Sequence, residues 1–182
     1  MTEKHLVEGC IDKNINAQKQ LYELYAKKML SVCIRYVCDE DDARDLLHDG
    51  FIRVFDKIVD YQGTGSFEGW IRRLFVNVCL EKLRKSKKDL QQSIDNYSEN
   101  VEMIDNSIVD IGEKMDADRL LSYIKELPEQ FRSTFNLFAV EGYSHDEISE
   151  MLGIASATSR SNYFRARMLL QKRIEKDIYK TK

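Results

Sequence analysis

The chain has 182 residues, enough for one large domain or two small ones, and 43% of them are hydrophobic, so each domain could have its own core. The net charge is −3, and eight glycines and a single proline leave few breaks in a sequence rich in good helix formers. This composition excludes a chain that is disordered throughout and predicts an all-α fold.

The sequence carries neither a membrane signal nor a metal-binding signal. No apolar run approaches the roughly 18 residues of a membrane span, and residues 1–5 lead into no signal segment, so we expect a cytoplasmic protein. The cysteines form no C-x-x-C pair, and the histidines are not aligned with them. We therefore expect no metal and no other cofactor, and we interpret Cys33, Cys38 and Cys79 as small buried residues.

The acidic residues are concentrated in one segment. Residues 1–88 hold 16 basic against 14 acidic side chains, residues 89–118 hold 1 against 9, and residues 119–182 hold 11 against 8. The overall charge therefore does not exclude binding to nucleic acid, because both flanking regions are slightly basic.

The first two predicted helices share one apolar spacing. The apolar face of the first comprises Leu21, Leu24, Tyr25, Met29, Val32, Cys33 and Tyr36. After an acidic turn at 39–42, the same offsets recur in Ala43, Leu46, Leu47, Phe51, Val54, Phe55 and Ile58. The turn's carboxylates are expected to cap the second helix, and the two helices are expected to pack face to face.

A loop at 61–66 precedes a third helix, for which Ser66 is a candidate cap. Its apolar side comprises Phe67, Trp70, Ile71, Leu74, Phe75, Val78 and Leu83. Its opposite side comprises Arg72, Arg73, Asn77, Arg84, Lys85, Lys87 and Lys88. With seven basic residues against two acidic ones at 67–88, this opposite side suits contact with phosphate.

Helical spacing fades at 89–116, where Asp, Asn, Ser and Glu dominate and a flexible acidic linker is predicted. The spacing returns near residue 117, and Pro128 suits a first helical position. We predict two small helical domains, at 1–88 and 117–182, joined by this linker.

The second domain contains the pattern of a helix-turn-helix. A short helix follows a cap at Ser144 and stops at Gly153, and a longer helix starts at Ser156. In such a motif the second helix fits the major groove of DNA. An ordinary helical hairpin with a solvated basic face is the alternative, and this spacing of cap and turn residues favours DNA binding.

The longer helix has an inward face at Ser159, Tyr163, Ala166 and Leu170, and no acidic residue occurs from 156 to 173. Arginine binds phosphate or guanine through two hydrogen bonds, and hydroxyl groups bind phosphates or base edges. The candidate DNA-binding residues are Ser156, Thr158, Arg160, Ser161, Asn162, Arg165 and Arg167.

Two sets of motifs resemble extracytoplasmic-function (ECF) sigma factors of the sigma-70 family. The C-terminal set is LPEQFR (127–132), EGYS (141–144), EI (147–148), LGI (152–154) and RAR (165–167). The N-terminal set is DARDLLHDGF (42–51), FEGWIRRL (67–74) with Asn77, and LRK (83–85). The resemblance covers roughly residues 15–178. It implies an alternative sigma factor, not an enzyme, with core RNA polymerase, promoter DNA and an anti-sigma factor as partners.

The resemblance also implies three binding surfaces. The polymerase surface would comprise Asp45, His48, Asp49, Ile52 and Arg53. The minus-ten promoter element would be bound by Tyr61, Gln62, Gly63, Thr64, Arg72, Arg73, Asn77, Arg84 and Lys88. The helix from Ser156 would read the minus-thirty-five element. A solvated helix face and a plain connecting loop are the alternatives for the first two surfaces.

Three places depart from the family pattern. Arg44 stands where an acidic residue is usual, His48 and Asp49 stand where Gln-Glu is usual, and Ser149 replaces Ala in the helix-turn-helix. The first two departures lie on the expected polymerase surface.

The main alternative function is a helix-turn-helix regulator that acts without being a polymerase subunit. It would require a dimer surface or an effector pocket, and it leaves the basic helix at 67–88 without a role. A helical enzyme is disfavoured because the sequence holds no phosphate-binding or zinc-protease motif. A protein-binding adaptor or an anti-sigma partner is a further alternative.

Overall fold

The computed structural model describes residues 3–89 and 117–180, and over these ranges it contains helices and short connections but no strand. The all-α prediction is therefore confirmed, while residues 90–116 of the predicted linker lie outside this part of the chain. The elements are α1 (Glu3–Ile11), α2 (Ile15–Val37), α3 (Glu40–Lys57), the 3-10 turn η1 (Ile58–Asp60), α4 (Phe67–Asp89), α5 (Ala117–Glu126), α6 (Glu129–Phe135), the π-helical segment η2 (Asn136–Val140), α7 (His145–Leu152) and α8 (Ser156–Lys180).

Side-chain caps set the starts of α3 and α4, as the sequence predicts. The carboxylate of Asp39 accepts a hydrogen bond from the backbone N–H of Asp42 at 2.9 Å, and the Ser66 hydroxyl accepts one from Gly69 at 3.0 Å. Both satisfy N–H groups that a first helical turn leaves without a partner. Pro128 immediately precedes α6 instead of occupying its first position, which differs from the prediction by one residue.

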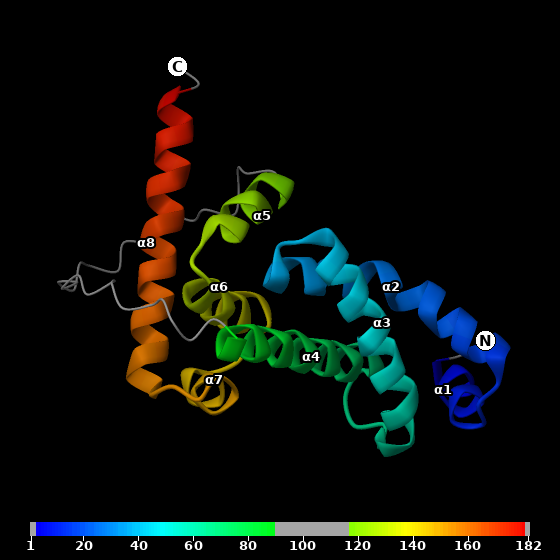
Figure 1. Ribbon diagram of the computed structural model, residues 1–182. Coiled ribbons are helices and arrows are strands. Elements are labelled where there is room, and N and C mark those ends of the chain that lie inside the picture. Colours follow the sequence, from blue (N-terminus) through cyan, green and yellow to red (C-terminus); the bar gives the residue numbers. More distant parts are fainter. Residues whose placement is uncertain (1–2, 90–116, 181–182) are drawn as a thin grey trace.

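Helices α2, α3 and α4 pack around one N-terminal core, with α1 against the start of α2 (Figure 1). Met29, Tyr36, Val54 and Phe75 are fully buried there, which confirms the face-to-face packing that their spacing predicts. Leu24 differs from the prediction because its side chain is 57% exposed.

Helix α4 is buried on a second side that the sequence analysis did not identify. Val76 and Leu80 are 0% and 2% exposed, and they belong to the same buried cluster as Leu137 and Ile148 from the C-terminal half. Figure 1 shows α4 running from α3 toward α6 and α7. The two halves of the chain therefore share a core along α4.

The C-terminal half has a further core between α5, α6 and α8. Tyr123, Leu127, Phe131, Ala166 and Leu170 are buried in it. The predicted inward face of α8 is confirmed by the burial of Ala166 and Leu170.

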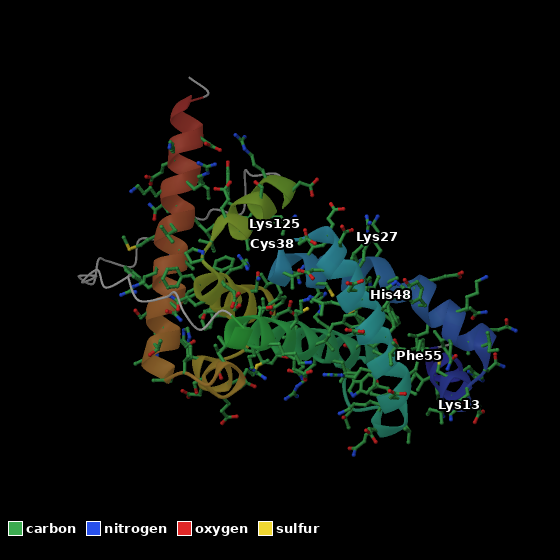
Figure 2. All side chains as sticks on the ribbon, in the orientation of Figure 1. Lys13, Lys27, Cys38, His48, Phe55 and Lys125 are labelled. Carbon is green, nitrogen blue, oxygen red and sulfur yellow. The ribbon has the colours of Figure 1, made fainter. Side chains whose placement is uncertain are left out.

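The cysteines are largely buried, as expected. Cys33 and Cys79 are fully buried, whereas Cys38 is half-buried and ends α2 in the left-handed conformation, with φ of 65°. Figure 2 shows Cys38 beside Lys125 of α5, whose carbonyl oxygen lies 3.7 Å from the cysteine Sγ. Within residues 3–89 and 117–180 there is neither a metal-binding group of side chains nor a helix suited to crossing a membrane.

Helices α3 and α4 approach each other closely at Gly50. A Cβ atom at this position would fall on the ring of Phe75, which also makes an edge-to-face contact with Phe51 at 5.3 Å between ring centroids. Only a residue without a side chain fits the crossing while the ring keeps its place.

We predict that Gly50→Ala lowers the free energy of unfolding by about 1 to 3 kcal/mol, because overpacking outweighs the better helix propensity of alanine. Chemical denaturation measures the effect. Asp56→Ala, at an exposed position of the same helix, is the control and should change stability by less than about 0.5 kcal/mol. Equal stability of the two variants would contradict the crossing geometry.

Candidate nucleic-acid interface

Local hydrogen bonds fix both the start of α7 and the turn between α7 and α8. The Ser144 hydroxyl accepts from the N–H of Glu147 at 3.2 Å, and the Glu147 carboxylate accepts from the N–H of Ser144 at 2.8 Å. This reciprocal pair starts α7. Gly153, with φ of 65°, ends it, and the Ser156 hydroxyl donates to the Asp146 carboxylate at 2.7 Å. The predicted helix-turn-helix is thereby confirmed.

The start of α8 presents several of the predicted DNA-binding side chains to solvent. Thr158, Arg160 and Ser161 are exposed. Asn162 is only 7% exposed, so its side chain lies inside the domain and not on this outer face. Ser156 is half-buried beside α7. The exposed set is therefore smaller than the predicted set and lies in the first turns of the helix.

Two further predicted residues, Arg165 and Arg167, lie over aromatic rings. The guanidinium of Arg165 is 6.0 Å from the ring centroid of Phe131 in α6, and that of Arg167 is 5.8 Å from Tyr163. Such contacts hold arginine against the domain. Both side chains are half-buried.

The loop before α4 combines an aromatic cluster with an exposed tip. The Tyr61 hydroxyl donates to the carbonyl of Gly65 at 3.0 Å, and its ring lies 5.5 Å from that of Trp70. Gln62, Gly63 and Thr64 are exposed, and Gly63 has φ of 73°, a conformation that favours glycine. The loop therefore presents polar groups beside a rigid aromatic base.

The predicted phosphate-binding face of α4 is partly covered by the C-terminal half. Arg72 lies 3.4 Å from the Glu141 carboxylate, and Arg84 donates to the carbonyl of Met151 in α7. Arg73 is exposed and Asn77 is half-buried, while the side chain of Lys88 lies outside the described part of the chain.

The predicted polymerase surface is the exposed side of α3. Asp45, His48, Asp49 and Ile52 are all exposed, at offsets that place them on one face. Arg53 instead forms a two-point ion pair with Glu81 of α4, at 2.7 and 2.8 Å. These hydrogen bonds to the Glu81 carboxylate raise the pKa of Arg53.

A shallow groove lies along this surface, between α3 and α4. Its volume is about 420 Å³, and Asp49, Ile52 and Arg53 are among its lining residues. An apolar side chain between charged ones is therefore available to a partner helix.

Comparison with known proteins decides the family. The family model for Sigma-70 region 2 matches residues 21–89, and the model for Sigma-70, region 4 matches residues 117–170. The chain belongs to the sigma-70 family. It is a sigma factor of the extracytoplasmic-function group, and hence a transcription initiation factor and not an enzyme, as the resemblance implies.

The relatives of this sigma factor span several bacteria. It is 30% identical over 154 residues to the ECF RNA polymerase sigma factor SigE of Mycolicibacterium smegmatis, covering 84% of this chain and 59% of that relative. It is 27% identical to the ECF RNA polymerase sigma-E factor of Haemophilus influenzae, covering 96% of both chains. The fold resembles that of the sigma factor RpoE of Bartonella quintana, solved with the anti-sigma factor NepR, at a TM-score of 0.55 and 21% identity over 86% of this chain and 96% of that one.

The residue of this sigma factor that sequence reasoning missed is Glu141. Its side chain is 2% exposed, and its carboxylate lies 2.9 Å from Arg35 of α2 as well as 3.4 Å from Arg72 of α4. Burial, and then the nearby Glu141 charge, raise the pKa of Tyr36 well above its usual value. The motif EGYS indicated only a turn, so no local signal revealed this contact.

His145 joins the two helices of the helix-turn-helix. Its ring stacks on Phe138 at 4.3 Å between centroids, and its Nδ1 lies 2.9 Å from the Ser159 hydroxyl in α8. Burial, together with the charge of Arg160, lowers the pKa of His145 below its usual value of 6.5. The fold therefore favours the neutral ring.

We predict that His145 makes stability depend on pH. Because folding lowers the pKa of His145, the neutral ring stabilises the folded state at pH values above the pKa of the unfolded state. This contribution is lost as the pH falls through the pKa of the folded state. The difference in unfolding free energy between the natural chain and His145→Gln should therefore shrink between about pH 8 and about pH 5. Denaturation at several pH values measures it. A difference independent of pH would contradict the assignment.

Proposed function

We propose that this sigma factor binds core RNA polymerase and directs it to promoters recognised at a minus-thirty-five and a minus-ten element. The observation that carries the proposal is the capped helix-turn-helix whose longer helix exposes Thr158, Arg160 and Ser161, in a chain that also matches region 2. A helix with exposed hydroxyl and guanidinium groups in its first turns suits base edges in the major groove.

The minus-ten element would be held by residues 61–64 and by the basic face of α4. The exposed Gly63 tip leaves room for an unstacked base beside the Tyr61 ring. Arg73 is exposed and free of an ion pair in the described part of the chain, so it supports phosphate contact.

The division into domains at 1–88 and 117–182 remains part of this proposal. Fully extended, the roughly 28 residues between them span about 90 Å, more than the roughly 70 Å of two turns of DNA. One chain is therefore long enough to contact both promoter elements.

The proposed partners follow from the same assignment. Core polymerase would contact the exposed side of α3 and promoter DNA the two basic surfaces. The solved relative from Bartonella quintana is bound to an anti-sigma factor, and we propose a partner of that class here. Because bacterial transcription takes place in the cytoplasm, the proposed location is cytoplasmic.

We predict that Ile52→Glu weakens binding to core polymerase by about tenfold, because it places a charge in the apolar part of the α3 surface. Titration of labelled protein with core enzyme measures the affinity. Val59→Glu is the matched control, since Val59 is 66% exposed against 60% for Ile52 but lies in η1, outside that surface. Equal losses in both variants would contradict the assignment.

We predict that Arg160→Ala costs about 1 to 3 kcal/mol of promoter binding and relaxes the preference at one base pair of the minus-thirty-five element. Lys172→Ala, an exposed position farther along α8, should weaken all sequences evenly and flatten the salt dependence. Transcription from a library randomised across this element measures both effects. An unchanged base preference with Arg160→Ala would show that another residue reads the base.

A further inference from the structure

A groove lies in the C-terminal half, where α5 and α6 pack along one side of α8 (Figure 1). Its volume is about 560 Å³, which is within the range of pockets that hold small molecules. Two polar contacts join α5 to α8 at this groove. Glu126 lies 3.1 Å from Arg173, and the Tyr123 hydroxyl donates to the Asp177 carboxylate at 2.5 Å. The walls of the groove are therefore held in place without a ligand.

Much of the lining of this groove is apolar. Leu127 and Phe131 are buried lining residues, whereas Met168 and Leu169 of α8 are 45% and 42% exposed. Filling the groove with an apolar group would remove these two exposed side chains from water, which favours binding.

The charged side chains of the lining are mostly basic. They are Arg165, Lys172, Arg173 and Lys176, against one acidic residue, Glu126, which is paired with Arg173. Lys172 and Lys176 are exposed and lie one helical turn apart, and within residues 3–89 and 117–180 neither forms an ion pair. The groove therefore offers two positive charges to an anion beside its apolar lining.

The aromatic side chains of the groove indicate the kind of apolar group that fits. The Arg173 guanidinium lies 5.8 Å from the ring centroid of Tyr123, and the Arg165 guanidinium lies 6.0 Å from that of Phe131. Because an arginine already covers one face of each ring, a flat ligand ring would have to displace it in order to stack there. An aliphatic chain needs no ring face, and the flexible side chain of Met168 can adapt to its shape.

We propose that this groove binds a free anionic amphiphile with one aliphatic tail, such as a long-chain carboxylate. The tail would contact Met168 and Leu169, and the head group would lie between Lys172 and Lys176. This site goes beyond the proposed function and does not depend on it. Lys172 is also the expected phosphate contact on α8, so a bound anion and DNA would compete for it.

Isotope labelling of the methionine methyl groups lets NMR test the site in the full chain. Met168 lines the groove and reports binding of the tail, whereas Met29 is fully buried in the N-terminal core and is the internal control. The probe is dodecanoate below its critical micelle concentration. It should shift the Met168 signal to saturation and leave the Met29 signal in place. Acetate, which lacks the tail, and dodecyltrimethylammonium, which carries the opposite charge, should shift neither signal at the same concentration.

One pair of variants tests the contact with the tail. Leu169→Gln removes an exposed apolar side chain from the groove and should weaken dodecanoate binding about five- to tenfold. Ile15→Gln, at a 79% exposed position of α2, is the matched control and should change the affinity by less than about twofold.

A second pair tests the contact with the head group. The double variant Lys172→Gln with Lys176→Gln removes both positive charges and should weaken dodecanoate binding about tenfold, since a hydrogen bond to a charged group is stronger than a neutral one. Lys19→Gln with Lys27→Gln, at exposed positions of α2, is the control for charge and should change the affinity by less than about twofold. Circular dichroism verifies that each variant keeps its helices.

Several results would overturn the proposal. An unchanged Met168 signal with dodecanoate shows that the groove does not take this ligand. Equal shifts with acetate or with dodecyltrimethylammonium show an unspecific contact with an anion or with an apolar tail. A shift that appears on raising the protein concentration alone shows that a second copy fills the groove. Saturation by an acidic amphipathic helical peptide, without binding of dodecanoate, shows a site for a protein helix instead.

Discussion

Helix α4 is the constraint on which the rest of the structure depends, because it is apolar on two sides. Phe75 faces α3 at the Gly50 crossing, while Val76 and Leu80 are buried with residues of the C-terminal half. A helix that is apolar on two sides must be covered on both. The N-terminal helices cover one side, and η2 and α7 cover the other, so this one element carries the core that the two halves share.

Glu141 turns this apolar contact into one with a defined geometry. Apolar surfaces alone attract without direction, whereas a carboxylate between Arg35 and Arg72 requires both helices in one placement. Loss of either arginine would leave the buried carboxylate with less compensation, which is costly in a poorly solvated site. The contact is thus specific, and it depends on charges that DNA phosphates would also attract.

The sequence predicts most of the helices because their signals are local. The side chains of Asp39, Ser66 and Ser144 accept hydrogen bonds from backbone N–H groups three residues away. The spacing of apolar residues likewise indicates one buried face of each helix. Contacts between distant segments leave no such signal: Arg35 and Glu141 are 106 positions apart. For the same reason the second buried face of α4 and the burial of Asn162 were not predicted. The sequence therefore predicts the exposed residues of the candidate site, but not the contacts between the N-terminal and C-terminal halves.

The π-helical segment η2 determines where Glu141 points. Here the N–H of Glu141 bonds the carbonyl of Asn136, five residues back, at 2.9 Å. Such a turn holds one residue more than an α-turn, so it has the effect of a one-residue insertion. Each residue of an α-helix advances by about 100° around the axis. Deleting a single residue from this segment would return it to an α-turn and leave the chain after it in about the same orientation, whereas the same number of residues in a regular α-helix would turn Glu141 by about 100° away from Arg35. Among homologous chains, the presence of this π-turn is therefore as informative as the identity of the acidic residue.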